Sequence, residues 1–314
     1  MPPKGLGARI GTCGANVTQM ARAQVATDGY REHVSAPTAV ELRRGVLAVS
    51  VLKDLDMEPA ALGVILTGPP TVWVAWSECR RALAGHDPET PDGRERLGRW
   101  LLARRWAADV PLEGLRERLR PVGLPVDHVL HPGLDWVRRR VLGDALDLGF
   151  GAVDIDPEDP DHVVLLPQAL LDAVGIDAEA DWVAAEAYLE RMGVVAAERM
   201  RLDAKGQLRP IGDCDAVTLL GSTALRTAIA SQSGGMGAVV VPMRRRGWTR
   251  LGLIDPAFGP AAAAATSAPE RGFPRPLLVT AEELALAIDG GHPETVVLRD
   301  PAVDEPWITD VLYR

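Results

Sequence analysis

The chain has 314 residues and a formal net charge of −9, with 47% hydrophobic and 25% charged residues. This balance excludes a disordered chain, and the length predicts two domains of ordinary size. Residues 1–150 carry 20 basic and 18 acidic side chains, a net charge of +2, which leaves −11 for residues 151–314. The acidic second half disfavours nucleic acid as a partner, although the weakly basic first half does not exclude it.

The start of the chain, Met1 to Gly7, lacks the apolar core of a secretory signal, and no apolar run approaches the roughly 20 residues that span a bilayer. Cys13, Cys79 and Cys214 are odd in number and far apart, which is typical of reduced thiols and not of a disulfide framework or a zinc site. We therefore expect a cytoplasmic protein with no membrane partner. The abundance of Ala, Gly and Pro, with Arg in place of Lys, indicates a bacterial source.

The first half of the chain has a helical pattern. Thr38 and Glu41 have the spacing of a capping box, which predicts a helix from about Ala39 to Leu55. Further helices are predicted, with Gly and Pro between them, at Pro59–Leu66, Thr71–Leu83, Asp92–Ala108 and Leu112–Leu119. Another is predicted from about Pro132 to just before Gly149, which is suited to a C-terminal cap. Residues 1–150 are therefore predicted to form a mainly helical domain.

The pattern changes after an acidic segment with two prolines, residues 154–161, where we place the domain boundary. Short aliphatic runs predict strands at Val163–Leu166, Ala216–Leu220, Ala238–Val241, Leu277–Val279 and Val296–Leu298. Helices are predicted between them at Ala178–Met200, Ser222–Ala230 and Ala281–Ile288. This alternation predicts an α/β domain over residues 151–314, with a mixed or parallel sheet, and leaves α+β as the alternative class.

The strongest candidate for a ligand site is the segment in which a predicted strand ends at Gly221 and a helix begins with Ser222 and Thr223. A helix start has unpaired amide N–H groups and a partial positive charge, so this turn is suited to a phosphate or carboxylate. Arg226 lies one turn into that helix, and Arg244 opens a run of three arginines. Arg244 reaches the same edge only if its strand is a parallel neighbour. Otherwise Ser222 is a helix cap.

A second candidate is a helix-turn-helix over residues 58–83. Residues Trp76–Leu83 resemble the end of the recognition helix in phage-repressor-type DNA-binding domains, which implies a transcription regulator. The match departs from that family at residues 72–75, Val-Trp-Val-Ala, where polar residues that read bases are expected. An apolar surface of this kind favours packing in a helical core, and we expect both Trp73 and Trp76 to be buried there.

Two other patterns suggest metal sites but lack essential parts. His128 and His131 have the spacing of one helical turn, yet nothing nearby in the sequence supplies a third ligand. Residues 154–158 alternate acidic side chains as a calcium loop does, without the glycine that its bend requires. We therefore predict no metal site, and the sequence identifies no cofactor.

Two functions of different classes remain open. The first is the binding of a small phosphate- or carboxylate-bearing ligand in the second half, at Gly221, Ser222, Thr223, Arg226 and Arg244. The second is a DNA-binding regulator whose acidic half senses a ligand or dimerises. The sequence leaves open whether the protein is an enzyme and whether it forms a homo-oligomer.

Overall fold

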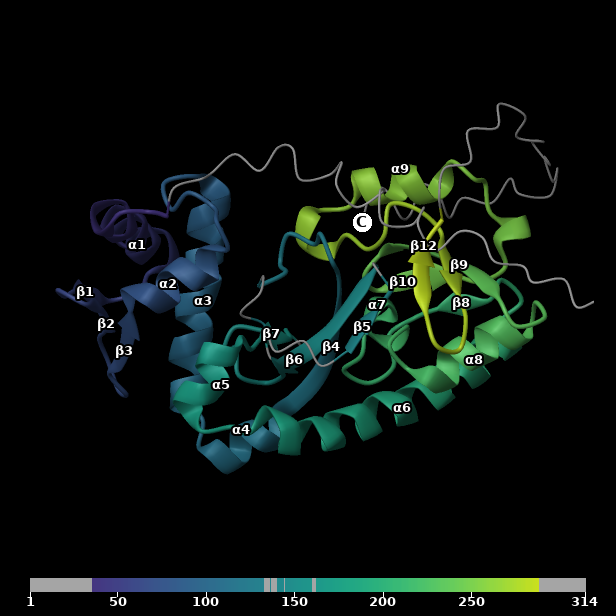
Figure 1. Cartoon of the computed structure of the whole chain (residues 1–314), viewed down its shortest axis with the longest axis horizontal. Coiled ribbons are helices and arrows are strands. Elements are labelled where there is room, and N and C mark those ends of the chain that lie inside the picture. The colour runs from purple at the N-terminus through teal and green to yellow at the C-terminus, as the bar shows by residue number, and fades with distance from the viewer. Residues whose placement is uncertain (1–35, 133–135, 137–139, 144, 160–161, 288–314) are drawn as a thin grey trace, which may run out of the picture. The chain divides into compact units, whose positions relative to one another are not determined.

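The computed structural model describes residues 36–287, apart from residues 133–135, 137–139, 144 and 160–161 (Figure 1). Contacts between Cα atoms place the described residues from Pro37 onward in one compact unit. The structure is about 45% helical and 21% strand, which confirms the prediction of a fold that mixes helices and strands. All pairings between the described strands are antiparallel, as in the α+β alternative.

The first helix, α1 (Ala39–Lys53), begins as the sequence predicts. The Thr38 hydroxyl accepts a hydrogen bond from the Glu41 amide at 3.3 Å, and the Glu41 carboxylate accepts one from the Thr38 amide at 2.7 Å. This reciprocal cap satisfies two N–H groups at the helix start. α1 packs against α3 (Pro91–Asp109), which confirms the helix predicted at residues 92–108.

Helices were expected at residues 59–66 and 71–83, but the structure has a three-stranded antiparallel sheet there. Its strands are β1 (Met57–Pro59), β2 (Gly63–Leu66) and β3 (Val72–Ala75), and α2 (Trp76–Leu83) follows. The helix predicted at residues 59–66 is therefore wrong throughout, and the one predicted at residues 71–83 is wrong in its first part, where β3 lies. The helix-turn-helix that they would form is absent from these residues.

Strand β3 explains why Trp73 is exposed, in contrast to Trp76. Strand period two buries Val72 and Val74 on one face of β3 and turns Trp73 to the other, where it is 45% exposed. The expectation that Trp73 is buried is wrong, because the apolar run was interpreted with a helical period. Trp76 is 5% exposed, as expected, and its indole N–H donates to the Ala60 carbonyl.

A second antiparallel sheet lies in the middle of the chain. α4 (Leu112–Arg118) leads into β4 (Leu119–Pro125), which pairs with β6 (Leu146–Ala152), and β6 also pairs with β5 (Arg140–Leu142) and β7 (Val164–Leu165). α4 and β7 confirm the elements predicted at those positions. The helix predicted at residues 132–149 is wrong, because every residue of β6 is buried and a strand with no exposed face shows no alternation.

Gly149, which was expected to end that helix, is required for a different reason. A Cβ on Gly149 would lie 2.3 Å from the Trp136 ring, so glycine is required where the indole packs on the strand. The predicted domain boundary after residue 150 falls within β6, and β6 pairs with β7 beyond the acidic segment. The division into residues 1–150 and 151–314 stays a prediction.

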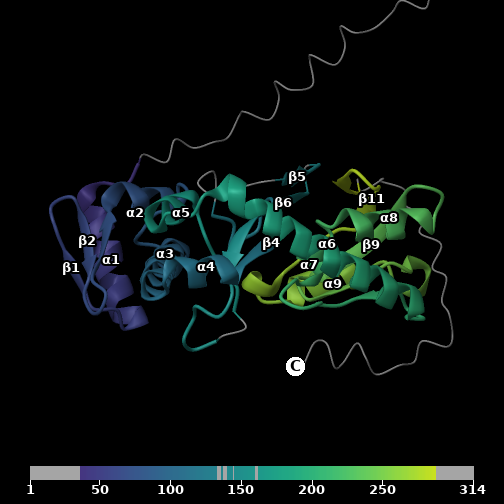
Figure 2. The ribbon, with the colours of Figure 1, turned by 90° about the horizontal axis from the view of Figure 1, so that it is seen from below.

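The rest of the described chain forms a five-stranded antiparallel sheet with helices around it. Its strand order is β12 (Leu284–Leu286), β11 (Leu277–Val279), β9 (Gly237–Met243), β10 (Arg246–Trp248) and β8 (Gln207–Leu208). The helices are α5 (Gln168–Val174), α6 (Ala178–Leu202), α7 (Ala216–Leu219), α8 (Thr223–Ser231) and α9 (Phe258–Ala265), with short 3-10 turns at η3 (Leu251–Leu253) and η4 (Ala268–Glu270). α6 lies beside β4 and α8 (Figures 1 and 2), so one helix bridges the second and third sheets.

Several predictions for this part are confirmed: α6, α8, β9 and β11 lie where the sequence places them. Two are wrong. Residues 216–219 are the short helix α7 and not a strand, and residues 284–286 form β12 where a helix was expected. The strand predicted at residues 296–298 lies outside the described residues. In the described part of the chain, no helix has the length and apolar character needed to cross a membrane.

Candidate functional site

The predicted ligand turn at residues 221–223 is a buried helix start. Asp215 caps α7, whose four residues are all buried, and the chain then turns through Gly221 into α8. Ser222 is the N-cap of α8 and is 0% exposed, with its hydroxyl 3.4 Å from the Leu225 amide. The turn therefore does form a helix N-terminus as expected, although it follows a helix.

A carboxylate of the protein already occupies this helix start. Glu190, on the neighbouring α6, accepts hydrogen bonds from the Thr223 amide at 2.8 Å, the Ala224 amide at 3.1 Å and the Ser222 hydroxyl at 2.9 Å. These are the groups that the sequence analysis offered to a phosphate or carboxylate. The affinity of the turn for anions is used to dock α6 on α8, and an external ligand would have to displace Glu190.

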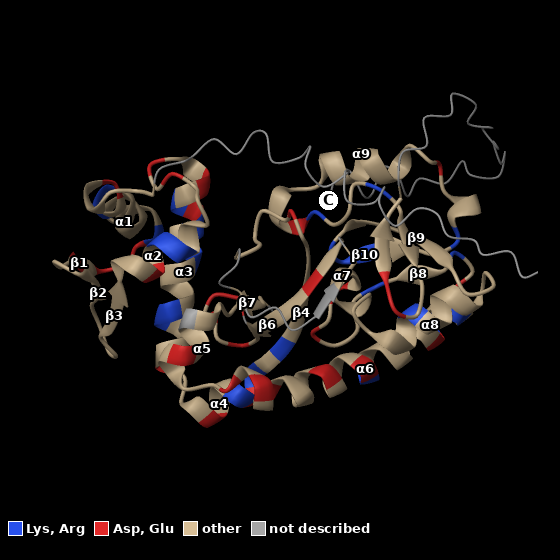
Figure 3. Ribbon diagram, viewed as in Figure 1, with Lys and Arg blue, Asp and Glu red and all other residues tan. Residues whose placement is uncertain are grey.

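The close approach of the two helices depends on a glycine. Gly193 faces Ser222, and a Cβ built on Gly193 would lie 1.8 Å from the Ser222 Oγ atom. Charged residues are distributed along the whole of α6 (Figure 3). Among them, Glu190 is directed at a helix N-terminus, so its charge interacts favourably with the α8 dipole.

The two arginines expected at this turn point to different partners. Arg226 is 2% exposed and donates to three backbone carbonyls, those of Leu220, Gly221 and Ala281. Arg244 forms an ion pair with Asp215, at 2.7 Å from its Nη2 atom and 2.9 Å from its Nε atom. Arg226 thus lies at the predicted turn, where it links backbone carbonyls of the protein. Arg244 is instead paired with the carboxylate of Asp215.

His128 and His131 also have different partners. The His131 Nε2 atom lies 2.9 Å from a carboxylate oxygen of Asp147, a buried residue of β6. The His128 Nδ1 atom accepts a hydrogen bond from the Leu130 amide at 3.1 Å. Burial, together with the nearby Arg244 charge, lowers the pKa of His128 to about 4. The described residues contain no cluster of three or more potential metal-binding side chains.

Thiol chemistry is equally disfavoured at the two cysteines that the structure describes. Cys79 and Cys214 are both free and buried. Burial raises the pKa of each thiol to about 12, helped by the neighbouring carboxylates of Glu78 and Asp215 respectively. Both thiols are protonated at neutral pH, as the prediction of unreactive thiols requires.

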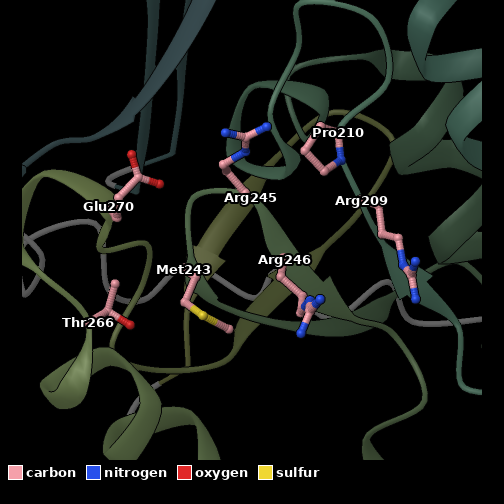
Figure 4. Close-up of a pocket in the computed structure, with 7 residues that line it drawn as sticks. All are labelled: Arg209, Pro210, Met243, Arg245, Arg246, Thr266 and Glu270. Atoms are coloured by element: carbon pink, nitrogen blue, oxygen red, sulfur yellow. The ribbon is translucent and has the colours of Figure 1, made fainter. Parts of the chain in front are cut away.

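A pocket lined by several arginines lies at the turn between β9 and β10. A pocket of about 340 Å³ is lined there by Arg209, Pro210, Met243, Arg245, Arg246, Thr266 and Glu270 (Figure 4). It contains three guanidinium groups and a single carboxylate. Neither Arg245 nor Arg246 has an ion pair within the part of the chain that the structure describes.

The register of the sheet explains why two of these arginines lie together. Gly247 on β10 is opposite Leu208 on β8, and the next residues beyond this pair are Arg246 and, directly after the end of β8, Arg209. Across the other edge of β10, Arg246 pairs with Met243. Arg209, Arg246 and Met243 therefore form a row at this end of the sheet, and in Figure 4 Arg209 and Arg246 extend in the same direction while Arg245 points away from them.

Neighbouring residues hold this row in place. The Arg209 Nε atom donates to the Gln207 side chain at 2.9 Å. Trp248, two residues after Arg246, packs edge to face on Phe258 of α9 with ring centroids 5.1 Å apart. The segment after α9 is fixed to the turn by a hydrogen bond of 2.8 Å from the Arg244 amide to the Glu270 carbonyl. The pocket thus has a wall from each of three segments that are far apart in sequence.

Only part of this site could be predicted from the sequence. The arginine run that begins at Arg244 was predicted to supply countercharge, whereas Arg209 was not singled out. The spacing of 37 residues between Arg209 and Arg246 has no periodic signal, since only the pairing of β8 with β10 brings them together. Comparison of this chain with models of protein families, with curated proteins and with solved structures finds no match.

Proposed function

We propose that the protein binds a small phosphate- or carboxylate-bearing ligand in the arginine pocket between β8, the β9–β10 turn and the segment after α9. The observation that carries the proposal is the pair Arg209 and Arg246, two cations that line one pocket, directly after β8 and at the start of the neighbouring strand β10. Two cations that share a small pocket repel each other. A bound anion would convert this repulsion into two charge-assisted hydrogen-bonding interactions.

The proposed ligand class is the one expected from the sequence, but the proposed site is the arginine pocket and not the turn at residues 221–223. The anion-binding groups of residues 221–223 are bonded to Glu190, whereas the guanidinium of Arg246 is without an ion pair among the described residues. The pocket volume of about 340 Å³ is at the lower end of the range for small-molecule sites. The proposal concerns binding and includes no reaction.

Thermal unfolding in sodium sulfate and in sodium chloride of equal ionic strength tests this function. A ligand that binds only the folded state raises Tm, so sulfate should raise the Tm of the wild type more than chloride does. Arg209→Gln and Arg246→Gln should each reduce that difference. Arg201→Gln, at an exposed arginine of α6, is the control that keeps it. An equal sulfate effect in all four proteins would contradict the proposal.

A second signature separates a ligand site from general charge effects. Without sulfate, Arg246→Gln removes the repulsion with Arg209 and should raise the free energy of unfolding. The same substitution should weaken anion binding. A variant that is both less stable and unchanged in its sulfate response would show that the pair has a structural role only.

We also propose that the protein resides in the cytoplasm, because its two described cysteines are free thiols, which a reducing compartment maintains. The regulator alternative depended on a pair of helices within residues 58–83. Strands β2 and β3 occupy that segment, and no observation in the described residues favours DNA binding there.

A further inference from the structure

The charges around the arginine pocket indicate which class of anion it binds. Three arginines line the pocket together with one acidic residue, Glu270, so the lining as a whole carries two net positive charges. A singly charged carboxylate would neutralise one of them. A dianion would neutralise both, and of the common anionic groups on small metabolites the phosphate monoester is the one that carries about two charges above pH 6.

The arrangement of donors leads to the same group. Arg209, directly after β8, and Arg246, at the start of β10, extend in the same direction in the pocket, so two guanidinium groups can approach one ligand (Figure 4). A carboxylate has two oxygens in one plane and matches a single guanidinium in bidentate fashion. A phosphate monoester has three terminal oxygens in a tetrahedral arrangement, which can accept hydrogen bonds from both guanidinium groups at once.

The remaining lining is suited to a small organic group. Met243 and Pro210 supply apolar surface next to the arginines. The Thr266 hydroxyl donates its proton to the Ala262 carbonyl at 2.6 Å, so towards the pocket its oxygen acts as an acceptor. A hydroxyl group on the ligand is the complementary donor. Resting on the function proposed above, we propose that the ligand is a phosphate monoester of a small hydroxylated compound.

A matched pair of probes tests this inference on the full chain. Glycerol 3-phosphate and glycerate have similar three-carbon hydroxylated skeletons and differ in carrying a phosphate monoester or a carboxylate. By isothermal titration at pH 7.5, glycerol 3-phosphate should bind about tenfold or more tightly than glycerate, because it engages both guanidinium groups. At pH 5 the phosphate becomes a monoanion, and the difference between the two probes should narrow.

Variants assign the binding to the pocket. Arg246→Gln and Arg209→Gln should each weaken glycerol 3-phosphate binding by roughly tenfold to a hundredfold, the range for loss of a charge-assisted hydrogen bond. Arg201→Gln on α6 should leave it unchanged. Thr266→Val, which keeps the size of the side chain and removes its oxygen, should weaken binding without affecting the response to inorganic sulfate, since sulfate has no hydroxylated skeleton.

The outcomes distinguish this inference from the function on which it rests. Equal binding of glycerate and glycerol 3-phosphate, with both lost in Arg246→Gln, would overturn the phosphate monoester and leave the anion site intact. No binding of either probe, together with no specific sulfate effect on Tm, would overturn both. Phosphate binding that survives in Arg209→Gln and Arg246→Gln would place the anion elsewhere and also overturn the inference.

Discussion

The buried imidazole of His128 should make the stability of the protein depend on pH between pH 7.5 and pH 4.5. The side chain is 6% exposed, and its Nδ1 atom accepts a hydrogen bond from Leu130. Burial and the Arg244 charge lower its pKa from 6.5 to about 4 in the folded protein, against smaller opposing effects of the Arg271 backbone, Asp215 and Asp127. The folded state therefore resists the proton that the unfolded chain accepts.

The sign and size of the effect follow from this difference in pKa. Above pH 6.5 the imidazole is neutral in both states and its contribution to stability is complete. As the pH falls from 6.5 towards 4, the unfolded chain takes up a proton and the folded protein does not, so stability is lost. Between pH 7.5 and pH 4.5 this linkage amounts to about 2.5 kcal/mol of unfolding free energy.

His128→Asn isolates this contribution. The asparagine side chain has an oxygen that can accept the Leu130 amide hydrogen bond, but it does not titrate. Urea unfolding at the two pH values should show a loss of stability that is smaller in the variant than in the wild type, by about 2.5 kcal/mol. His86→Asn gives a comparison: burial and the Arg96 charge also lower the pKa of this exposed histidine, so the variant should reduce the loss of stability, but by less than His128→Asn does. Equal losses in the wild type and His128→Asn would refute the reasoning.

The remaining predictions concern the contact of α6 with α8 and the two tryptophans of the first sheet. Glu190→Ala should lower the free energy of unfolding by about 1–3 kcal/mol in urea, because it leaves the α8 amides without their acceptor. Gly193→Ala should lower the free energy of unfolding by more than Glu190→Ala does, because the new Cβ collides with the Ser222 side chain. Adding Ser222→Gly to Gly193→Ala should restore part of the lost stability, and purely additive effects of the two substitutions would contradict this contact. Trp76→Ala should cost roughly 3–5 kcal/mol, whereas Trp73→Ala, on an exposed face, should cost far less, and similar values for both would show that Trp73 is buried in solution.

Long amphipathic helices and their caps could be predicted from the sequence. Thr38 and Glu41 marked the start of α1, and the predicted bounds of α6 differ from the observed ones by two residues. The errors lie where a short apolar run has no unique period. Residues 216–219 were interpreted as a strand, yet Asp215 caps them as a helix by accepting the Thr218 amide at 2.7 Å. Four buried residues in succession fit either element, and only the cap distinguishes them.

The candidate site was predictable in its chemistry and not in its location. A helix N-terminus at Ser222 did indicate an anion, and the anion found there is Glu190, from 32 residues earlier in the chain. Sequence spacing contains no information about which carboxylate of α6 faces α8, because that depends on how the helices pack. An exposed acidic residue in an amphipathic helix has the same pattern whether it contacts water or a helix start.

The same limit applies to the arginine pocket and explains why its cations are informative. If this end of the sheet served only for stability, Arg209 and Arg246 would each be better placed beside an acidic residue, since opposite charges attract and like charges repel. Among the described residues, the acid that lines the pocket, Glu270, forms no ion pair with either of them. Repulsion that the fold maintains within a pocket is an arrangement that a bound dianion would relieve. Arg246→Glu should therefore stabilise the folded protein through attraction to Arg209 and abolish anion binding at once, a combination that a purely structural arginine would not produce.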